Sequence, residues 1–142
     1  MSGALTPQVG AEDLNAFLRQ AFPAGDGLAR VTSVRPGAVL LEQPWSERML
    51  RPGGVLSGPT LMSLADTAAY ALVLAHVGLQ PMAVTSGLTI NFLRGCKPGV
   101  LTAHGELLKL GRRLAVCDVR MWTEGPDRPA AQASVTYALP GE

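Results

Sequence analysis

Asp66 is the residue of this sequence whose type and position most clearly suggest chemistry. It is the only formally charged side chain between Arg51 and Arg94, apart from His76, and it lies within a long apolar stretch. Because an ionised carboxylate loses its hydration when it is buried, a core helix keeps one only where it has a function or a dedicated partner. Asp66 is therefore predicted to be catalytic. The alternative is a structural anchor that pairs with Arg51 or with Ser and Thr hydroxyls.

Gly58 precedes Asp66 by eight residues and is expected at the start of the same helix. Pro59 suits the first helical position because it lacks an N–H, and Gly58 is then expected at the cap. A helix start presents free N–H groups and a positive dipole end, which suit an oxygen that acquires negative charge. Eight residues span about 12 Å of helix, too far for both groups to reach one carbon atom. The pair therefore predicts a site shared by two antiparallel copies.

The helix that holds Asp66 is predicted to be the core of the fold. Its apolar residues cover nearly the whole circumference, so we expect it to be buried all round. The apolar stretch from Pro59 to Leu79 is long enough to span a membrane. Polar residues interrupt it, and Asp66 would be costly in a bilayer, so no membrane is expected.

The rest of the chain predicts an α+β fold in which a sheet wraps around this helix. The region 45–58, rich in Gly and Pro, is predicted to be a loop. Hydrophobic period and turn residues predict a short helix over 11–22, brief strands over 28–35 and 38–43, and long antiparallel strands from Met82 to Leu93 and over 100–110, 113–123 and 130–139. We expect one domain over residues 1–142, with an N-terminal helical segment over 1–27.

Composition excludes several classes of function. The net charge is +1, without a cluster of basic residues, so nucleic acid is not an expected partner. The charged fraction of 16% is below the usual level of about a quarter, which favours an oligomer whose surface is partly covered. The Cys and His residues lack the close spacing of zinc sites, so neither metal nor cofactor is expected. The start of the sequence is unlike a secretory signal, and a cytoplasmic location is expected.

Four short motifs resemble the PaaI-like hotdog thioesterases over roughly residues 28–139. They are Pro-Gly-Gly-Val-Leu-Ser-Gly at 52–58, Leu-Ala-Asp-Thr-Ala at 64–68, Val-Thr at 84–85 with Ile-Asn-Phe-Leu at 90–93, and Lys-Leu-Gly-Arg-Arg at 109–113. The resemblance implies the hotdog fold, an antiparallel sheet wrapped around a long central helix. It also implies a homodimer or a dimer of dimers, that is, a homotetramer.

Carried over residue by residue, the resemblance makes the Gly58 amide the polarising donor and Asp66 the nucleophile or general base. The family's second helper, a Ser or Thr at the start of the third strand, matches Thr85. Strict alternation places Ser86 on the opposite face, and which of the two points inward stays open. The family signature is altered at three positions. Ser57 replaces its histidine, Arg51 its asparagine and Pro59 its second glycine.

Substrate contacts are expected from the loop and from a basic turn. Ser57 keeps a hydroxyl that can bond to a carbonyl or to water, and Arg51 and Ser86 are expected near the substrate. Arg112 and Arg113 match the family's basic turn and are expected to bind CoA phosphates, with Arg94 and Lys97 as weaker candidates; the alternative is that these cations are solvated turn charges. His76 and His104 are expected to be structural.

The resemblance implies an acyl-CoA thioesterase that releases a free acid and CoA from an acyl- or aryl-CoA. Two alternatives remain open at this stage. One is a hotdog dimer that binds acyl-CoA without hydrolysing it, because the signature histidine is lost. The other is an enoyl-thioester hydratase, which is disfavoured because such enzymes generally use a histidine partner where Ser57 stands.

Overall fold

The computed structural model describes residues 5–22 and 29–141, and it has the α+β fold predicted from the sequence. Its helices and strands follow the predicted order, and most bounds agree within one or two residues. The elements are α1 (Ala11–Ala21), β1 (Arg30–Arg35), β2 (Ala38–Gln43), the 3-10 turn η1 (Glu47–Met49), β3 (Leu50–Arg51), β4 (Val55–Leu56), α2 (Gly58–Val77), β5 (Val84–Phe92), β6 (Leu101–Leu110), β7 (Leu114–Trp122) and β8 (Ala131–Ala138). The predicted positions Pro23 and Leu28 lie outside the described residues.

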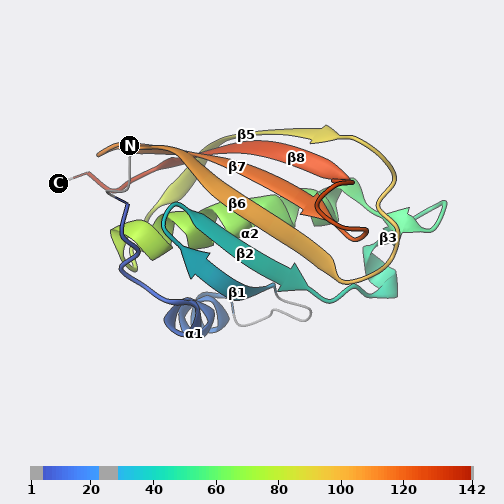
Figure 1. The fold of residues 1–142 in the computed structure, drawn as a ribbon, viewed down its shortest axis with the longest axis horizontal. Helices are drawn as coiled ribbons and strands as arrows, with labels where there is room; N and C mark the ends of the chain where they lie inside the picture. Colours follow the sequence, from blue (N-terminus) through green and yellow to red (C-terminus); the bar gives the residue numbers. More distant parts are fainter. Residues whose placement is uncertain (1–4, 23–28, 142) are drawn as a thin grey trace.

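One antiparallel sheet curves around α2, which is the hotdog arrangement (Figure 1). Its six strands have the order β1-β2-β6-β7-β8-β5, so β1 and β5 form its edges. Side chains from the inner face of the sheet pack on α2 and form the core with it. α2 is long and apolar enough to cross a membrane by length and composition, but most of it is buried inside the sheet.

The start of α2 corrects the predicted capping residue. Ser57, not Gly58, is the N-cap, and its Oγ accepts a hydrogen bond from the Thr60 N–H at 3.3 Å. Gly58 and Pro59 are the first two helical residues. A serine hydroxyl reaches back to the orphan N–H groups of the first turn, which a glycine cannot do. The helix ends at Val77, and Gly78 follows with φ +97, a conformation that favours glycine.

The two halves of α2 have different surroundings, which corrects the expectation that the helix is buried all round. From Ala68 to His76 every residue is buried. In the first half Met62 and Ser63 are exposed, and Asp66 and Thr67 are half-buried. The prediction was wrong for the first half because composition shows that a face is apolar, not whether the same chain covers it.

Strand β5 contains a β-bulge, which breaks the strict alternation predicted from Met82 onward. Thr85 pairs with Tyr137 and Gly87 with Thr136 of β8, so Ser86 is an extra residue without a partner. An extra residue reverses the side-chain faces on its two sides. As a result Thr85 faces α2, and so do Leu88 and Ile90 beyond the bulge.

The region 45–58 is more ordered than the predicted loop. It contains η1 and a small hairpin of β3 and β4, in which Leu50 pairs with Leu56. Positive φ values at Gly53 (+103) and Gly54 (+76) allow the tight turn between these strands. The Ser57 N–H donates to the Met49 carbonyl at 2.8 Å, and this bond ties the hairpin to the start of α2.

Two buried polar side chains join the outer elements to the core. Asn15 of α1 donates from Nδ2 to the Val31 carbonyl at 2.9 Å and accepts from the Val31 N–H at 2.8 Å, which attaches α1 to β1. His76 accepts the Gly37 N–H at Nε2 (2.8 Å), and its Nδ1 lies 2.9 Å from the Leu72 carbonyl. Since a carbonyl only accepts, Nδ1 carries the proton. The structural role expected for His76 is confirmed.

Candidate active site

Asp66 lies at the centre of a hydroxyl cluster. Its Oδ1 accepts a hydrogen bond from Thr85 Oγ1 at 2.6 Å and a second from the Tyr137 hydroxyl at 2.8 Å. The Tyr137 hydroxyl also lies 3.2 Å from the Asp66 backbone carbonyl. Within residues 5–22 and 29–141 no donor binds the other carboxylate oxygen, Oδ2. The carboxylate is therefore held by one oxygen and free at the other.

Three elements bring these groups together. Asp66 comes from the open half of α2, Thr85 from the edge strand β5, and Tyr137 from the neighbouring strand β8. Thr85 and Tyr137 are directly paired in the β5–β8 ladder, so their side chains leave the sheet side by side. The bulge at Ser86 turns Thr85 toward α2. Bulges often occur next to active sites because they re-aim one side chain.

Tyr137 is buried, with 3% of its surface exposed. Burial raises the pKa of its hydroxyl; the Thr85 hydrogen bond opposes this rise, and the bond and charge of Asp66 add to it. The hydroxyl therefore keeps its proton near neutral pH, and it acts as a donor to the carboxylate.

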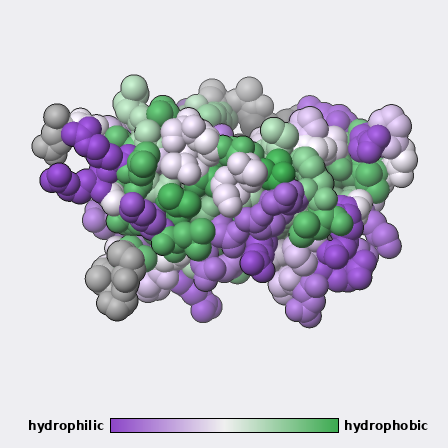
Figure 2. Space-filling model, turned by 90° about the horizontal axis from the view of Figure 1, so that it is seen from above, coloured by the Kyte–Doolittle hydropathy of each residue, from purple (hydrophilic) through white to green (hydrophobic). Residues whose placement is uncertain are grey.

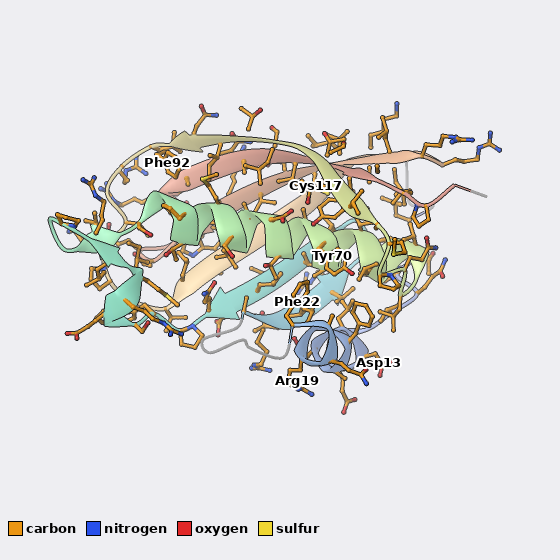
Figure 3. All side chains as sticks on the ribbon, turned by 180° about the vertical axis from the view of Figure 1, so that it is seen from behind. Asp13, Arg19, Phe22, Tyr70, Phe92 and Cys117 are labelled. Carbon is orange, nitrogen blue, oxygen red and sulfur yellow. The ribbon has the colours of Figure 1, made fainter. Side chains whose placement is uncertain are left out.

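A pocket of about 460 Å³ opens beside Asp66. Its polar wall carries Ser63, Asp66, Thr67 and Thr85, and its apolar wall includes Phe22, Tyr70, Pro81, Ala83 and Val84. Tyr70 on α2 lies next to Phe22 (Figure 3); its ring centroid is 6.2 Å from that of Phe22 and 5.8 Å from that of Tyr137. A carboxylate beside an apolar pocket is suited to an acyl group whose reacting carbon must reach Oδ2.

Gly58 does not contact Asp66 within one chain, because it lies two helical turns earlier on α2. No acceptor in the described part of the chain bonds to its N–H, so this donor is free at the helix start. The ring of Phe92, at the far end of β5, lies against Gly58, and an added Cβ would be 3.3 Å from its Cζ (Figure 3). Pro59 next to it has no N–H, so Gly58 is the donor that this turn offers.

The other expected loop residues have different surroundings. Ser57 is occupied as the helix cap, with its Oγ also 2.9 Å from Thr60 Oγ1. Arg51 lies exposed on β3 and does not pair with Asp66, so that form of the anchor alternative is not found. Ser86 points away from the Asp66 cluster, and its hydroxyl lies 3.4 Å from the Thr136 carbonyl. Thr85 is thus the hydroxyl that faces inward.

Arg112 and Arg113 lie at the opposite end of α2 from Gly58. With Val77, Gln80 and the chain near Gly141, they line a second pocket of about 490 Å³. Val77 follows Asp66 by eleven residues, which is about 16 Å along the helix axis. Both arginines are exposed. The weaker candidates are engaged elsewhere: Arg94 Nη1 donates to the Pro129 carbonyl at 2.5 Å, and Lys97 pairs with Glu124 at 3.5 Å.

Sequence reasoning missed Tyr137. The alternation of Ala131, Ala133, Val135 and Tyr137 along the last strand places it on the inner face, because the three preceding members are apolar. A tyrosine at the end of these inward-facing residues brings a hydroxyl into the core, and this hydroxyl needs a hydrogen-bond partner there. That partner comes from α2, 71 positions away in the sequence.

No group of three His, Cys, Asp or Glu side chains in residues 5–22 and 29–141 has the arrangement of a metal site. Both cysteines are free thiols and buried. Burial raises the pKa of Cys117 to about 12 and also raises the pKa of Cys96. Neither thiol is a candidate nucleophile, because the reactive form is the thiolate.

Comparison with known proteins places the chain in a family. Residues 53–130, more than half of the chain, match the model of the thioesterase superfamily. A "putative thioesterase" from Silicibacter sp. TM1040 superposes with a TM-score of 0.87 at 37% identity, covering 99% of this chain and 97% of that one.

A "Hypothetical Thioesterase Protein" from Streptococcus pneumoniae TIGR4, solved with coenzyme A, superposes with a TM-score of 0.75 at 26% identity, covering 92% of this chain and 97% of that one. A "Putative esterase" of Saccharolobus solfataricus is 32% identical over 91 residues, which are 63% of this chain and 64% of the relative, so the match spans less than two thirds of that relative. The chain, as its motifs indicated, belongs to the thioesterase superfamily and has its hotdog fold.

Proposed function

We propose that the protein is an acyl-CoA thioesterase that hydrolyses an acyl- or aryl-CoA to the free acid and CoA. The observation that carries the proposal is the half-buried Asp66 carboxylate, held at Oδ1 and free at Oδ2, beside an apolar pocket. Membership of the thioesterase superfamily and the coenzyme A bound to the S. pneumoniae relative support a CoA thioester as substrate.

The proposed active unit is a homodimer, alone or within a dimer of dimers, joined through β5. No strand in the described part of the chain pairs with its outer side, and a long unprotected edge is a ready site for strand pairing. Large apolar side chains are exposed along it, including Val84 and Phe92 (53% each). Figure 2 looks onto this side of the molecule and shows apolar surface across its middle.

Pairing through β5 would also complete the site. Thr85, near one end of β5, bonds to Asp66, and Phe92 at the other end packs on Gly58. Two β5 strands that pair antiparallel about a two-fold axis near Leu88 place the Phe92 end of one beside the Thr85 end of the other. Gly58 of the partner subunit then approaches Asp66, and two equivalent sites form.

In the proposed reaction the thioester carbonyl oxygen accepts the N–H of Gly58 of the partner subunit. Asp66 Oδ2 either attacks the carbonyl carbon, giving an acyl anhydride with Asp66 that water then hydrolyses, or takes a proton from a water that attacks the carbon. The carbon–sulfur bond then breaks, the sulfur leaves as CoA thiol with a proton, and one water is consumed in forming the acid. One oxyanion donor contributes about 10²- to 10³-fold in rate, and a positioned base about 10²- to 10⁴-fold.

The same site supports a second candidate, a dimer that binds acyl-CoA without hydrolysing it. The observation in its favour is that Ser57, which stands where the family has a histidine, is occupied as a helix cap and so adds no group to the reaction. Release of CoA thiol from a panel of acyl-CoA esters separates the two candidates. Both cysteines are buried and burial raises the pKa of each thiol, so their reaction with a thiol reagent is expected to be slow.

Subunit complementation tests the shared site. Asp66→Asn removes the carboxylate, and Gly58→Pro removes the donor N–H. Each variant alone is expected to keep no more than about a hundredth of wild-type turnover. If two chains share a site, half of the dimers re-formed from an equal mixture are heterodimers, and each heterodimer has one intact site out of two. The mixture therefore regains about a quarter of wild-type turnover. A mixture that stays inactive although subunits exchange would contradict the shared site.

Gly58→Ala is the matched control for Gly58→Pro. It places a similar Cβ against the Phe92 ring, 3.3 Å from Cζ, but keeps the N–H. We expect Gly58→Ala to lose much less activity than Gly58→Pro. Equal losses would assign the effect to packing against Phe92 and remove Gly58 as the donor.

A further inference from the structure

The reactive carboxylate is held by two donors that come from one strand pair. Thr85 and Tyr137 are paired across β5 and β8, and both donate to Asp66 Oδ1. Two bonds to the same oxygen restrict rotation of the carboxylate about its last torsion, which is otherwise broad. Thr85 corresponds to a helper position of the family, whereas Tyr137 became visible only in the fold.

We propose that Tyr137 is a positioning residue that fixes the Asp66 carboxylate, so that Oδ2 alone meets the substrate. The inference rests on the proposed thioesterase function. The Tyr137 hydroxyl is 2.8 Å from Oδ1 and 3.2 Å from the Asp66 carbonyl. Because it has a single proton, its main bond is to the nearer acceptor, Oδ1, and the carbonyl is a weaker second acceptor.

The surroundings of Tyr137 make it a rigid support. Its side chain is buried to 3% exposure, and its strand is hydrogen-bonded on both sides, to Thr85 of β5 and to Ala115 of β7. Thr85 by contrast is exposed on an edge strand next to a bulge. Of the two donors, Tyr137 is therefore the one whose position is fixed by the interior of the sheet, and a reactive group needs such a support to keep its geometry.

Tyr137→Phe tests this role because it removes the hydroxyl and keeps the ring. Loss of a hydrogen bond to a charged group is expected to lower kcat by about 10-fold, with KM changed less than about twofold. Thr136→Val, which removes a hydroxyl from the neighbouring residue of β8, is the matched control and is expected to keep kcat within about twofold. Thermal unfolding of each variant shows whether it is folded.

A readout that a merely structural role would not change comes from the Asp66→Asn background. If Tyr137 acts through the carboxylate, Tyr137→Phe leaves the residual rate of Asp66→Asn unchanged. A further 10-fold loss in that background, or wild-type kcat in Tyr137→Phe alone, would overturn the inference. If Tyr137→Phe does not fold, two unnatural side chains at position 137 give the test: 4-aminophenylalanine keeps a donor and must retain more of the wild-type kcat than 4-methylphenylalanine, which fills the same space without one. Equal losses would overturn the inference.

The outcomes also separate this inference from the proposed function. A wild-type protein that releases no thiol from any acyl-CoA overturns both. If the wild type turns over acyl-CoA, Asp66→Asn strongly lowers this turnover and Tyr137→Phe keeps the wild-type kcat, only the role of Tyr137 is overturned.

Discussion

The first and second halves of α2 belong to one helix but have opposite surroundings. In the second half, the sheet and the outer elements of the same chain bury every residue from Ala68 to His76. In the first half, the chain leaves Met62 and Ser63 exposed and Asp66 and Thr67 half-buried. The second half is apolar except for His76 and the hydroxyl of Tyr70, and the first half holds the carboxylate and the free N–H of Gly58.

This difference separates stability from chemistry along a single helix. The buried half contributes packing, and its buried histidine has both ring nitrogens bonded. Among residues 5–22 and 29–141, nothing bonds to Asp66 Oδ2 or to the Gly58 N–H in the open half, which costs stability but leaves two groups for a substrate. Substitutions in the first half should therefore change turnover more than folding, and those in the second half should do the reverse.

The largest expected effect is that of Asp66→Asn on turnover. The change removes the charge and keeps the volume, and the amide oxygen can still accept from Thr85 and Tyr137. We expect kcat to fall by about 10²- to 10⁴-fold with KM little changed, and the dimer to be at least as stable as the wild type. Steady-state kinetics and thermal unfolding check both parts. A folded dimer with wild-type turnover would refute the proposed role of Asp66.

In the second half, Leu72→Ala is expected to have the opposite profile. Leu72 is fully buried, so the truncation should lower the free energy of unfolding by about 2–5 kcal/mol. Activity per folded site should change little, because Leu72 contacts neither pocket. Denaturant unfolding measures the loss. The control is Leu108→Ala at an exposed position, which should change the free energy of unfolding by no more than about 0.5 kcal/mol. A large drop in kcat of Leu72→Ala with little loss of stability would contradict the assignment of the second half of α2 to stability.

Beyond the end of α2, the combined change Arg112→Ala and Arg113→Ala should raise KM for CoA esters by about 10-fold. The reason is the loss of charge-assisted bonds to phosphates. A short thioester without the nucleotide should be unaffected. The control removes two other exposed cations, Arg120 and Arg128, which pair with Asp118 and Glu124. An equal rise in KM for both substrates would show that Arg112 and Arg113 do not bind the phosphates.

The smallest expected effect is that of Ser57→Ala at the start of α2. Loss of the cap should cost about 1 kcal/mol of stability, while kcat changes by no more than a few-fold. Unfolding and turnover of the same preparation give both numbers. A fall in kcat of about 10²-fold or more would instead show that the Ser57 hydroxyl takes part in the reaction, as the family's histidine position first indicated.

Much of the fold could be predicted from the sequence because the relevant signals are local. The period-two pattern, the turn residues and the apolar helix gave the order and the approximate bounds of the elements. Asp66 could be singled out because a charge in an apolar helix is visible without coordinates, and Gly58 because Pro59 marks a helix start. Thr85 followed from the resemblance to the family.

Only the tertiary structure decided which side chains meet. The bulge at Ser86 is invisible to a periodic reading, yet it turns Thr85 toward α2. The bond between Tyr137 and Asp66 joins residues 71 positions apart, and it depends on the register of β8 against β5. Burial also depends on the whole fold: the same apolar composition is wrapped by the sheet in one half of α2 and left open in the other. The sequence thus determined the elements and the reactive residue types, and long-range register and wrapping, which no local pattern encodes, decided the site.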